Sequence, residues 1–265
     1  MAKRRDVEAA VDNEDDDVAD DQRHNQIPTV GLWILRASAA PIAVIFRRGP
    51  TKQVRLVRWD LRTDDFQRGQ WMAARAYADR SRISPDGVYV DYVGIRRGNE
   101  WRAIAKVPYF TPLAVREPTG WVSPTSTALP PWLLHSGPLW PQEPLDGWQP
   151  VAEPGAYPLH KPHPTIPDLV LQRRDARPVM DGYASWTDRH AYDYRLFDAR
   201  GDVEHDLGTA DWGDWHPSGD LAVAREGLIT RIPMLRRAPG EARVIADFNG
   251  ETFEKLPPPP RALVW

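Results

Sequence analysis

Short apolar runs separated by turn residues fill most of the chain after residue 28, and this pattern constrains the fold more than any other feature. The runs have the length of strands, and few windows keep the 3.6-residue apolar period of a helix. The 27 prolines and 18 glycines break helices and supply turns. A short helical turn stays open within residues 70–80. We expect a mainly-β domain over residues 28–265, with strands at Val30–Leu35, Ile42–Phe46, Gln53–Leu61, Val88–Val93, Trp101–Val107, Tyr192–Phe197, Leu221–Ala224, Leu228–Ile232 and Ala242–Ala246.

Two distant segments share one order of turns and strands. Residues 83–87 (ISPDG) precede a strand, a turn at Gly94–Glu100 and a second strand, and residues 215–219 (WHPSG) precede the same series. In each segment proline presets the first turn position, and glycine supplies the positive φ that closes the turn. Such turns between strands predict hairpins.

The turn Ser84-Pro85-Asp86-Gly87 resembles the blade turn of TolB-like and WD40-like β-propeller repeats, and His216-Pro217-Ser218-Gly219 resembles it in part. The segment Gly69-Gln70-Trp71 is similar to one in uncharacterised bacterial propeller-like proteins. The resemblance implies an all-β propeller and carries no established activity.

The spacing of prolines suggests how many blades there are. Pro85 and Pro217 lie 132 residues apart, which is three steps of 44, about the length of such a blade. The prolines at 41, 85, 130, 178 and 217 then predict five blades. A propeller closes by joining its ends, so we expect Val30–Leu35 to pair with Arg261–Trp265.

Two segments differ from the rest. Residues 1–27 hold nine acidic and four basic residues, so we expect a disordered acidic tail that either aids solubility or competes with an anionic partner for a basic face. Residues 118–167 hold thirteen prolines and four tryptophans. We expect there an irregular segment pinned by its tryptophans, or a degraded repeat.

The composition excludes several classes of site and location. The chain has no cysteine, no glycine-rich phosphate loop and no run of about 18 apolar residues that would span a bilayer. It also lacks the apolar stretch of a secretory signal. We therefore expect a cytoplasmic protein without a cofactor, a metal or a membrane contact. Nucleic acid is not an expected partner, because the net charge is −3 and no reading motif is present.

Acidic and histidine side chains are dense between residues 188 and 220. Paired carboxylates can perform acid–base catalysis or bind calcium, and some propellers are glycosidases. Solvated turn residues are the alternative explanation, since a hairpin is expected over residues 192–207. The members of this candidate polar site are Asp188, His190, Asp211, Asp214 and His216.

Basic residues cluster in turns that a propeller places on one rim. Loops between second and third strands share that rim with the links between blades, and arginine there suits carboxylate or phosphate. The alternative is that Arg-Arg-Gly is only a soluble turn. The residues expected to bind a partner are Arg47, Arg48, Lys52, Arg75, Arg96, Arg97 and Arg225, with Arg80 and Arg82 on a link between blades.

These features favour a non-enzymatic binding or scaffold protein whose partner is another protein or an anionic surface. One alternative is an enzyme of the glycosidase or hydrolase kind that uses the stretch 188–220. Another is an immunity or regulatory partner in a bacterial conflict system, for which no particular residue argues.

Overall fold

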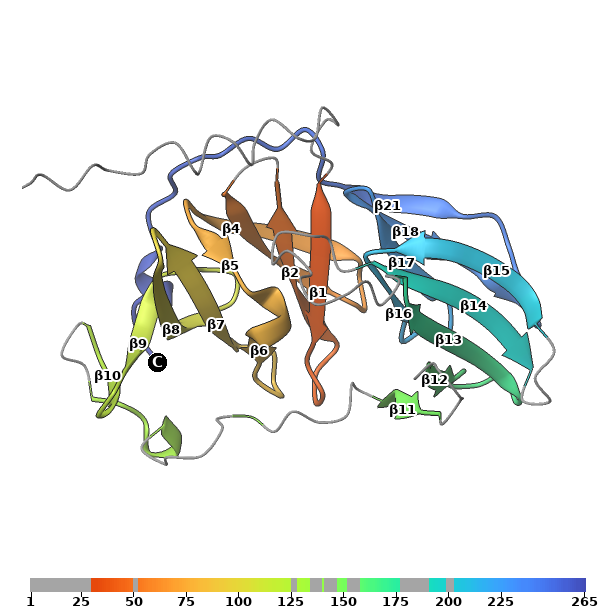
Figure 1. The fold of residues 1–265 in the computed structure, drawn as a ribbon, viewed down its shortest axis with the longest axis horizontal. Helices are drawn as coiled ribbons and strands as arrows, with labels where there is room; N and C mark the ends of the chain where they lie inside the picture. Colours follow the sequence, from red (N-terminus) through yellow and green to blue (C-terminus); the bar gives the residue numbers. More distant parts are fainter. Residues whose placement is uncertain are drawn as a thin grey trace, which may run out of the picture.

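The computed structural model describes residues 30–49, 52–124, 128–133, 140, 147–151, 158–176, 191–198 and 203–265, and the predicted acidic tail lies outside these ranges. The described chain is built of antiparallel strands (Figure 1). Its helical pieces are three 3₁₀ turns, η1 (Ala78–Arg80), η2 (Pro131–Leu133) and η4 (Pro260–Ala262). Within the same residues, no helix has the length and apolarity to cross a membrane.

Four sheets follow one another along the chain. Sheet 1 has the order β1-β2-β3-β4, and sheet 2 has the order β10-β9-β8-β7-β5, with β6 also paired to β7. The strands of sheet 1 are β1 (Gly31–Arg36), β2 (Ile42–Arg48), β3 (Val54–Asp60) and β4 (Asp65–Met72). Those of sheet 2 are β5 (Arg75–Ala76), β6 (Arg82–Ile83), β7 (Tyr89–Arg96), β8 (Asn99–Lys106), β9 (Pro112–Glu117) and β10 (Gly120–Val122).

The second half of the chain forms two more large sheets. Sheet 3 has the order β11-β12-β13-β14-β15, sheet 4 has the order β16-β17-β18-β21, and β19 pairs with β20 alone. The strands of sheet 3 are β11 (Gln149–Pro150), β12 (Leu159–Pro162), β13 (Leu169–Asp175), β14 (Tyr192–Asp198) and β15 (Val203–Ala210). The others are β16 (Trp212–Trp215), β17 (Leu221–Arg225), β18 (Leu228–Ile232), β19 (Met234–Leu235), β20 (Ala238–Pro239) and β21 (Arg243–Asp247).

Every expected strand coincides with an observed one, with ends that differ by at most three residues. The two predicted hairpins are confirmed, since β6 pairs with β7 and β16 pairs with β17 across turns that Gly87 and Gly219 close at positive φ. The window 70–80 is divided between the end of β4, β5 and η1. Five repeats are not confirmed: the described residues form four sheets of four or more strands.

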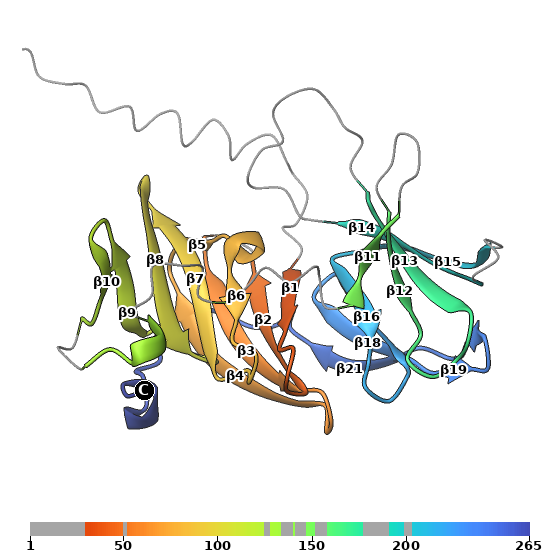
Figure 2. The same cartoon turned by 90° about the horizontal axis from the view of Figure 1, so that it is seen from below.

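The sheets pack face to face in the spatial order 2, 1, 4, 3 (Figures 1 and 2). One apolar cluster joins sheet 1 to sheet 2, a second joins sheet 1 to sheet 4, and a third joins sheet 4 to sheet 3. Strand β2 shows why, because Val44 and Phe46 point toward sheet 2 while Ala43 and Ile45 point toward sheet 4. Among the described residues, no apolar cluster joins sheet 2 to sheet 3.

The expected closure by strand pairing is wrong. Strand β1 pairs with β2 and lies at the edge of sheet 1, and residues 260–262 form η4 instead of a strand. The C-terminal residues run past sheet 1 and end on the face of sheet 2 that is turned away from sheet 1, where Trp265 packs beside Tyr89 and Trp132. Four prolines at 257–260 remove the amide donors that a strand would need here.

The segment Gly69-Gln70-Trp71 joins three parts of the chain. The buried Gln70 Oε1 accepts hydrogen bonds from the backbone N–H groups of Phe110 and Thr111, at 2.9 and 3.0 Å, and Gln70 Nε2 donates to the Leu256 carbonyl at 3.1 Å. A Cβ at position 69 would lie 1.9 Å from the Pro108 carbonyl oxygen, so only glycine fits beside Pro108. Sheet 1, sheet 2 and the C-terminal segment are thereby held together.

We predict that Gln70→Ala lowers the free energy of unfolding by about 3 kcal/mol, because the buried N–H of Phe110 and the half-buried N–H of Thr111 lose their acceptor, and an unsatisfied buried donor costs about 1–3 kcal/mol. Urea denaturation followed by tryptophan fluorescence measures the change. Gln67→Ala, at an exposed position of the same strand, is the matched control and should stay within about 0.5 kcal/mol of the wild type. Equal stability of the two variants would contradict the role assigned to Gln70.

Candidate binding cleft on sheet 2

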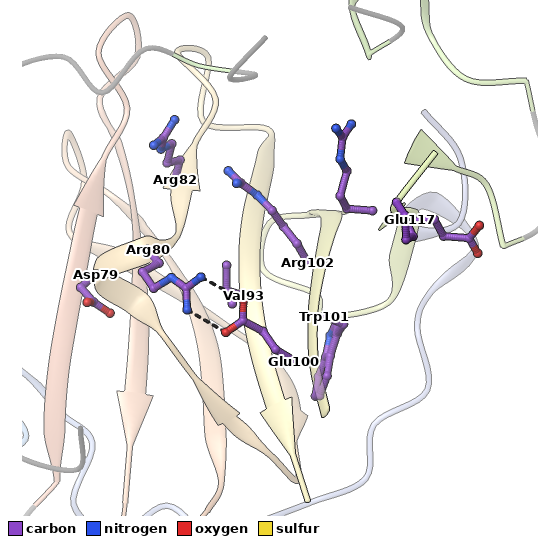
Figure 3. Close-up of a pocket in the computed structure, with 10 residues that line it drawn as sticks. Asp79, Arg80, Arg82, Val93, Glu100, Trp101, Arg102 and Glu117 are labelled. Carbon is purple, nitrogen blue, oxygen red and sulfur yellow. Dashed lines mark hydrogen bonds and ion pairs between the residues drawn. The ribbon is translucent and has the colours of Figure 1, made fainter. Parts of the chain in front are cut away.

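The outer face of sheet 2, the face turned away from sheet 1, is half polar and half aromatic. Strand alternation produces it: Val90 and Tyr92 of β7 point toward sheet 1, so Asp91 and Val93 point outward. The polar half forms a cleft of about 640 Å³ (Figure 3). Its lining residues are Asp79, Arg80, Arg82, Val93, Glu100, Trp101, Arg102, Arg116, Glu117 and Pro118.

Two of the four arginines in the cleft are bound by carboxylates of the same sheet. Arg102 grips the fully buried Asp91 with two hydrogen bonds of 2.8 and 2.5 Å, and this contact raises the pKa of Arg102. Arg80 of η1 grips Glu100 of β8 in the same forked manner at 2.7 and 2.9 Å, which raises the pKa of Arg80. These two pairs fix the floor of the cleft.

The other two arginines bind no carboxylate within the described part of the chain. Arg82 of β6 donates from Nη1 to the Trp140 carbonyl at 2.9 Å, and its Nε has no described acceptor. Arg116 of β9 lies over the Trp121 ring, 5.6 Å from the ring centre. Guanidinium groups with unused donors beside a cleft can take a carboxylate or a phosphate.

The predicted arginine rim is only partly a surface. Arg47 is 1% exposed, and its Nε and Nη2 both donate to the Phe248 carbonyl. The prediction that Arg47 lies on a binding face is therefore wrong, because the C-terminal segment covers it. Arg225 is exposed, but Nε and Nη2 donate to the carbonyls of Thr209 and Leu207.

The remaining rim residues do not line the cleft on sheet 2. Arg48 is partly buried and lies near Arg75, Asp79 and Asp211, and burial lowers its pKa. The exposed ones are Lys52, Arg75, Arg96 and Arg97. Sequence reasoning thus named Arg80 and Arg82 but missed Arg116, whose only signal is its outward position on β9.

The candidate polar site is not gathered into one place. Asp211 accepts the Leu32 N–H at 3.1 Å, whereas Asp214, which is 2% exposed, accepts Arg36 at 2.7 Å and Lys161 at 2.9 Å. Each carboxylate therefore links neighbouring sheets. Asp188 and His190 lie outside the described residues. Within the described ranges, no group of three His, Asp or Glu side chains could hold a metal ion.

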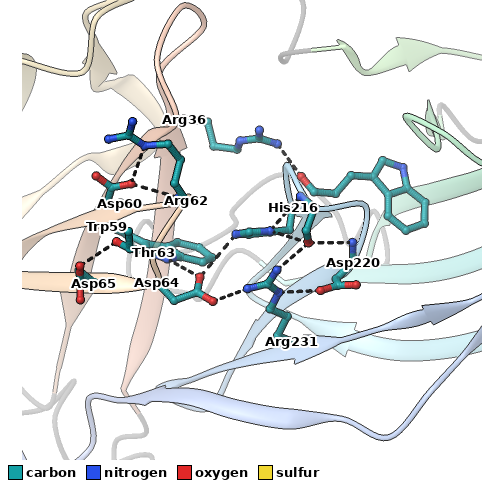
Figure 4. A network of polar contacts seen from close by, with 12 residues as sticks. Arg36, Trp59, Asp60, Arg62, Thr63, Asp64, Asp65, His216, Asp220 and Arg231 are labelled. Carbon is teal, nitrogen blue, oxygen red and sulfur yellow. Dashed lines mark hydrogen bonds and ion pairs between the residues drawn. The ribbon is translucent and has the colours of Figure 1, made fainter.

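His216 belongs to a network between sheets 1 and 4 (Figure 4). Its Nδ1 accepts the Ser218 N–H at 3.2 Å, and its Nε2 lies 3.5 Å from Asp64 Oδ1. Arg231 donates to Asp220 at 2.8 Å, to Ser218 Oγ at 2.6 Å and to Asp64. Burial, followed by the positive charge of Arg231, lowers the pKa of His216. The imidazole is therefore neutral at pH 7, and its Nδ1 accepts the hydrogen bond that holds the turn at Ser218.

We predict that the protein loses stability as the pH falls below about 6.5, the pKa of an unfolded histidine. Because the pKa of His216 is lowered by folding, the unfolded chain binds the proton first, and this contribution is present above pH 6.5 and lost below it. His216→Asn keeps an acceptor for Ser218 and cannot titrate. Urea unfolding at pH 7.5 and 5.5 should therefore show a smaller loss for this variant, by up to about 1.4 kcal/mol.

His205→Asn, on β15 away from the network, is the control and should lose as much stability as the wild type over the same interval. Identical losses for His216→Asn and His205→Asn would show that the His216 proton does not matter.

Comparison with protein-family models, with curated proteins and with solved structures found no match to this chain.

Proposed function

We propose that the chain is an open propeller of four blades that acts as a non-enzymatic binding protein for an acidic segment of another protein. The shared meander of the four sheets supports the architecture, since a proline-containing turn joins β1 to β2, β6 to β7, β12 to β13 and β16 to β17. These turns lie at residues 37–41, 84–88, 163–168 and 216–220.

Contacts between these turns and the first strands support a common axis. Ala39 N–H donates to the Pro85 carbonyl at 2.8 Å, and His163 Nε2 donates to the Gly219 carbonyl at 2.7 Å, so neighbouring turns touch in two pairs. Asp214 of β16 binds Arg36 of β1 and Lys161 of β12, which brings together the first strands of sheets 1 and 4 and the second strand of sheet 3. Blades of a propeller converge on their first strands in the same way.

The propeller is open between sheets 2 and 3, which leaves the outer face of sheet 2 for a partner. The observation that carries the function is the pair Arg82 and Arg116, which line the cleft there and meet no described carboxylate. Four arginines and three acidic residues line the cleft, with Asp91 beneath them, so the formal charges cancel. A polyanion is therefore not attracted, while one or two carboxylates with apolar neighbours fit beside Val93, Trp101 and Pro118.

Catalysis receives no such support. The described members of the candidate polar site, Asp211, Asp214 and His216, each have structural partners, and they share none of them. Binding is therefore the better proposal.

We predict that peptides selected from a random 12-residue display library on the purified protein contain an acidic residue beside aromatic or aliphatic ones. Arg82→Ala combined with Arg116→Ala should weaken the binding of a selected peptide at least tenfold, because its carboxylate loses both free guanidinium partners. Fluorescence anisotropy with the labelled peptide measures the affinity.

Arg243→Ala is the matched control, since Arg243 is exposed on the edge strand β21 far from the cleft and should leave the affinity unchanged. The proposal fails if the selected peptides lack acidic residues, or if the double variant binds them as well as the wild type.

A further inference from the structure

The C-terminal segment crosses the molecule from sheet 4 to the outer face of sheet 2 (Figures 1 and 2). Its first part is firmly held: Arg47 donates to the Phe248 carbonyl at 3.0 and 3.1 Å, and Glu251 binds Arg55 and Arg68 at 3.2 and 2.6 Å. The contacts of Arg47 and Arg55 are buried or nearly so, whereas Arg68 is exposed, and together they fix the segment against sheet 1.

The last nine residues, 257–265, are held much more lightly. They pair with no strand, and only Ala262 among them is buried. Arg261 donates to the Tyr109 hydroxyl at 2.9 Å, while Leu263 and Val264 are 38% and 53% exposed. Trp265 packs on Tyr89 and Trp132, but its indole N–H, though buried, meets no described acceptor. An unsatisfied buried donor weakens such a contact.

The surface beneath Trp265 is the aromatic half of the outer face of sheet 2. Ile104 and Ala114 form its buried floor, and Tyr89, Trp132 and Trp140 surround it. The hydrogen bond from Arg82 to the Trp140 carbonyl joins this aromatic half to the arginine cleft. Trp265 therefore occupies one half of the face whose other half is the cleft.

The balance of forces favours exchange at this site. Docking orders nine residues but buries few of them, so the lost chain entropy opposes the gain from burial. The four prolines reduce that loss because their φ is already restricted, which makes the docked state accessible without a sheet bond.

We propose that residues 257–265 are a reversible internal ligand of the aromatic half of this face, and that a partner displaces them when it docks. The inference rests on the proposed function for the identity of the face, and it adds the regulation of access to it. The released state exposes Tyr89, Trp132 and Trp140, and an aromatic or proline-rich stretch of the partner takes the place of Trp265 beside the acidic residue that meets Arg82.

A synthetic peptide with the sequence of residues 256–265, labelled at its N-terminus, tests exchange directly. A chain truncated after residue 256 should bind it at least tenfold more tightly than the full chain, whose own segment fills the site. Fluorescence anisotropy measures both affinities, and circular dichroism checks that the truncated chain is folded. A peptide carrying Trp265→Ala should bind at least tenfold more weakly.

A full chain carrying Trp265→Ala makes the result independent of the truncation, because every strand remains in place. It should bind the wild-type peptide at least fivefold more tightly than the unmodified chain does, whereas Val264→Ala, at an exposed neighbouring side chain, should change nothing. Equal binding by the full chain, the folded truncated chain and the Trp265→Ala chain would overturn the inference. A dimer of the full chain that Trp265→Ala dissociates would also overturn it, because the segment would then dock between two copies.

The peptide has no acidic side chain, so its binding separates this inference from the function proposed for the cleft. The truncated chain with Arg116→Ala alone, which keeps the hydrogen bond between Arg82 and Trp140, should still bind the peptide. Weaker binding of acidic peptides by that variant bears only on the function proposed for the cleft. Failure of the 256–265 peptide to bind the folded truncated chain bears only on the role proposed for the C-terminal segment.

Discussion

Burial of sheet 1 on both of its faces is the constraint on which the rest of the structure depends. Strand β2 has six consecutive buried residues, with alternate side chains in two different apolar clusters. A sheet without a solvent face must be covered twice, and sheets 2 and 4 provide the two covers. Each fully buried aliphatic side chain contributes about 1.5–3 kcal/mol, so this central pair of interfaces dominates the stability of the arrangement.

Polar side chains between the sheets then set how neighbouring sheets are aligned. Asp214, Asp64 and Gln70 each bind groups that are distant in the sequence, and all are buried or nearly so. A buried charge or amide is costly unless every partner is present, so such contacts favour one alignment over others. This explains why Asp211, Asp214 and His216, which the sequence suggested as part of a catalytic site, form contacts between neighbouring sheets.

The two end sheets have one face each that no other sheet covers in the described chain. On sheet 2 that face holds two features that one hydrogen bond joins, the arginine cleft and the aromatic surface under Trp265. The C-terminal segment connects this face to sheets 4 and 1, because it is anchored at Phe248 and Glu251 before it reaches Tyr89.

The sequence by itself determined the class of the fold and nine of the 21 strands of the described chain. Proline and glycine at residues 84–87 and 216–219 set local backbone angles, and β2 reads as a continuous apolar run, so both could be recognised without tertiary information. Strand β13 was missed because it follows a proline-rich stretch and ends in polar residues. Trp121, Trp140 and Trp148 pack in apolar clusters, as was expected of the tryptophans in residues 118–167.

Only the tertiary structure decided which arginines line the cleft. Arg47 and Arg116 look alike as sequence, yet the first is enclosed by a segment about 200 residues later in the chain, and the second lies beside a cleft. The expected strand closure was wrong for the same reason, because the position of residues 257–265 depends on contacts with Tyr89 and Tyr109 in a different sheet. Local patterns specify backbone angles and burial of a strand face, whereas the neighbours of a side chain depend on how distant segments pack.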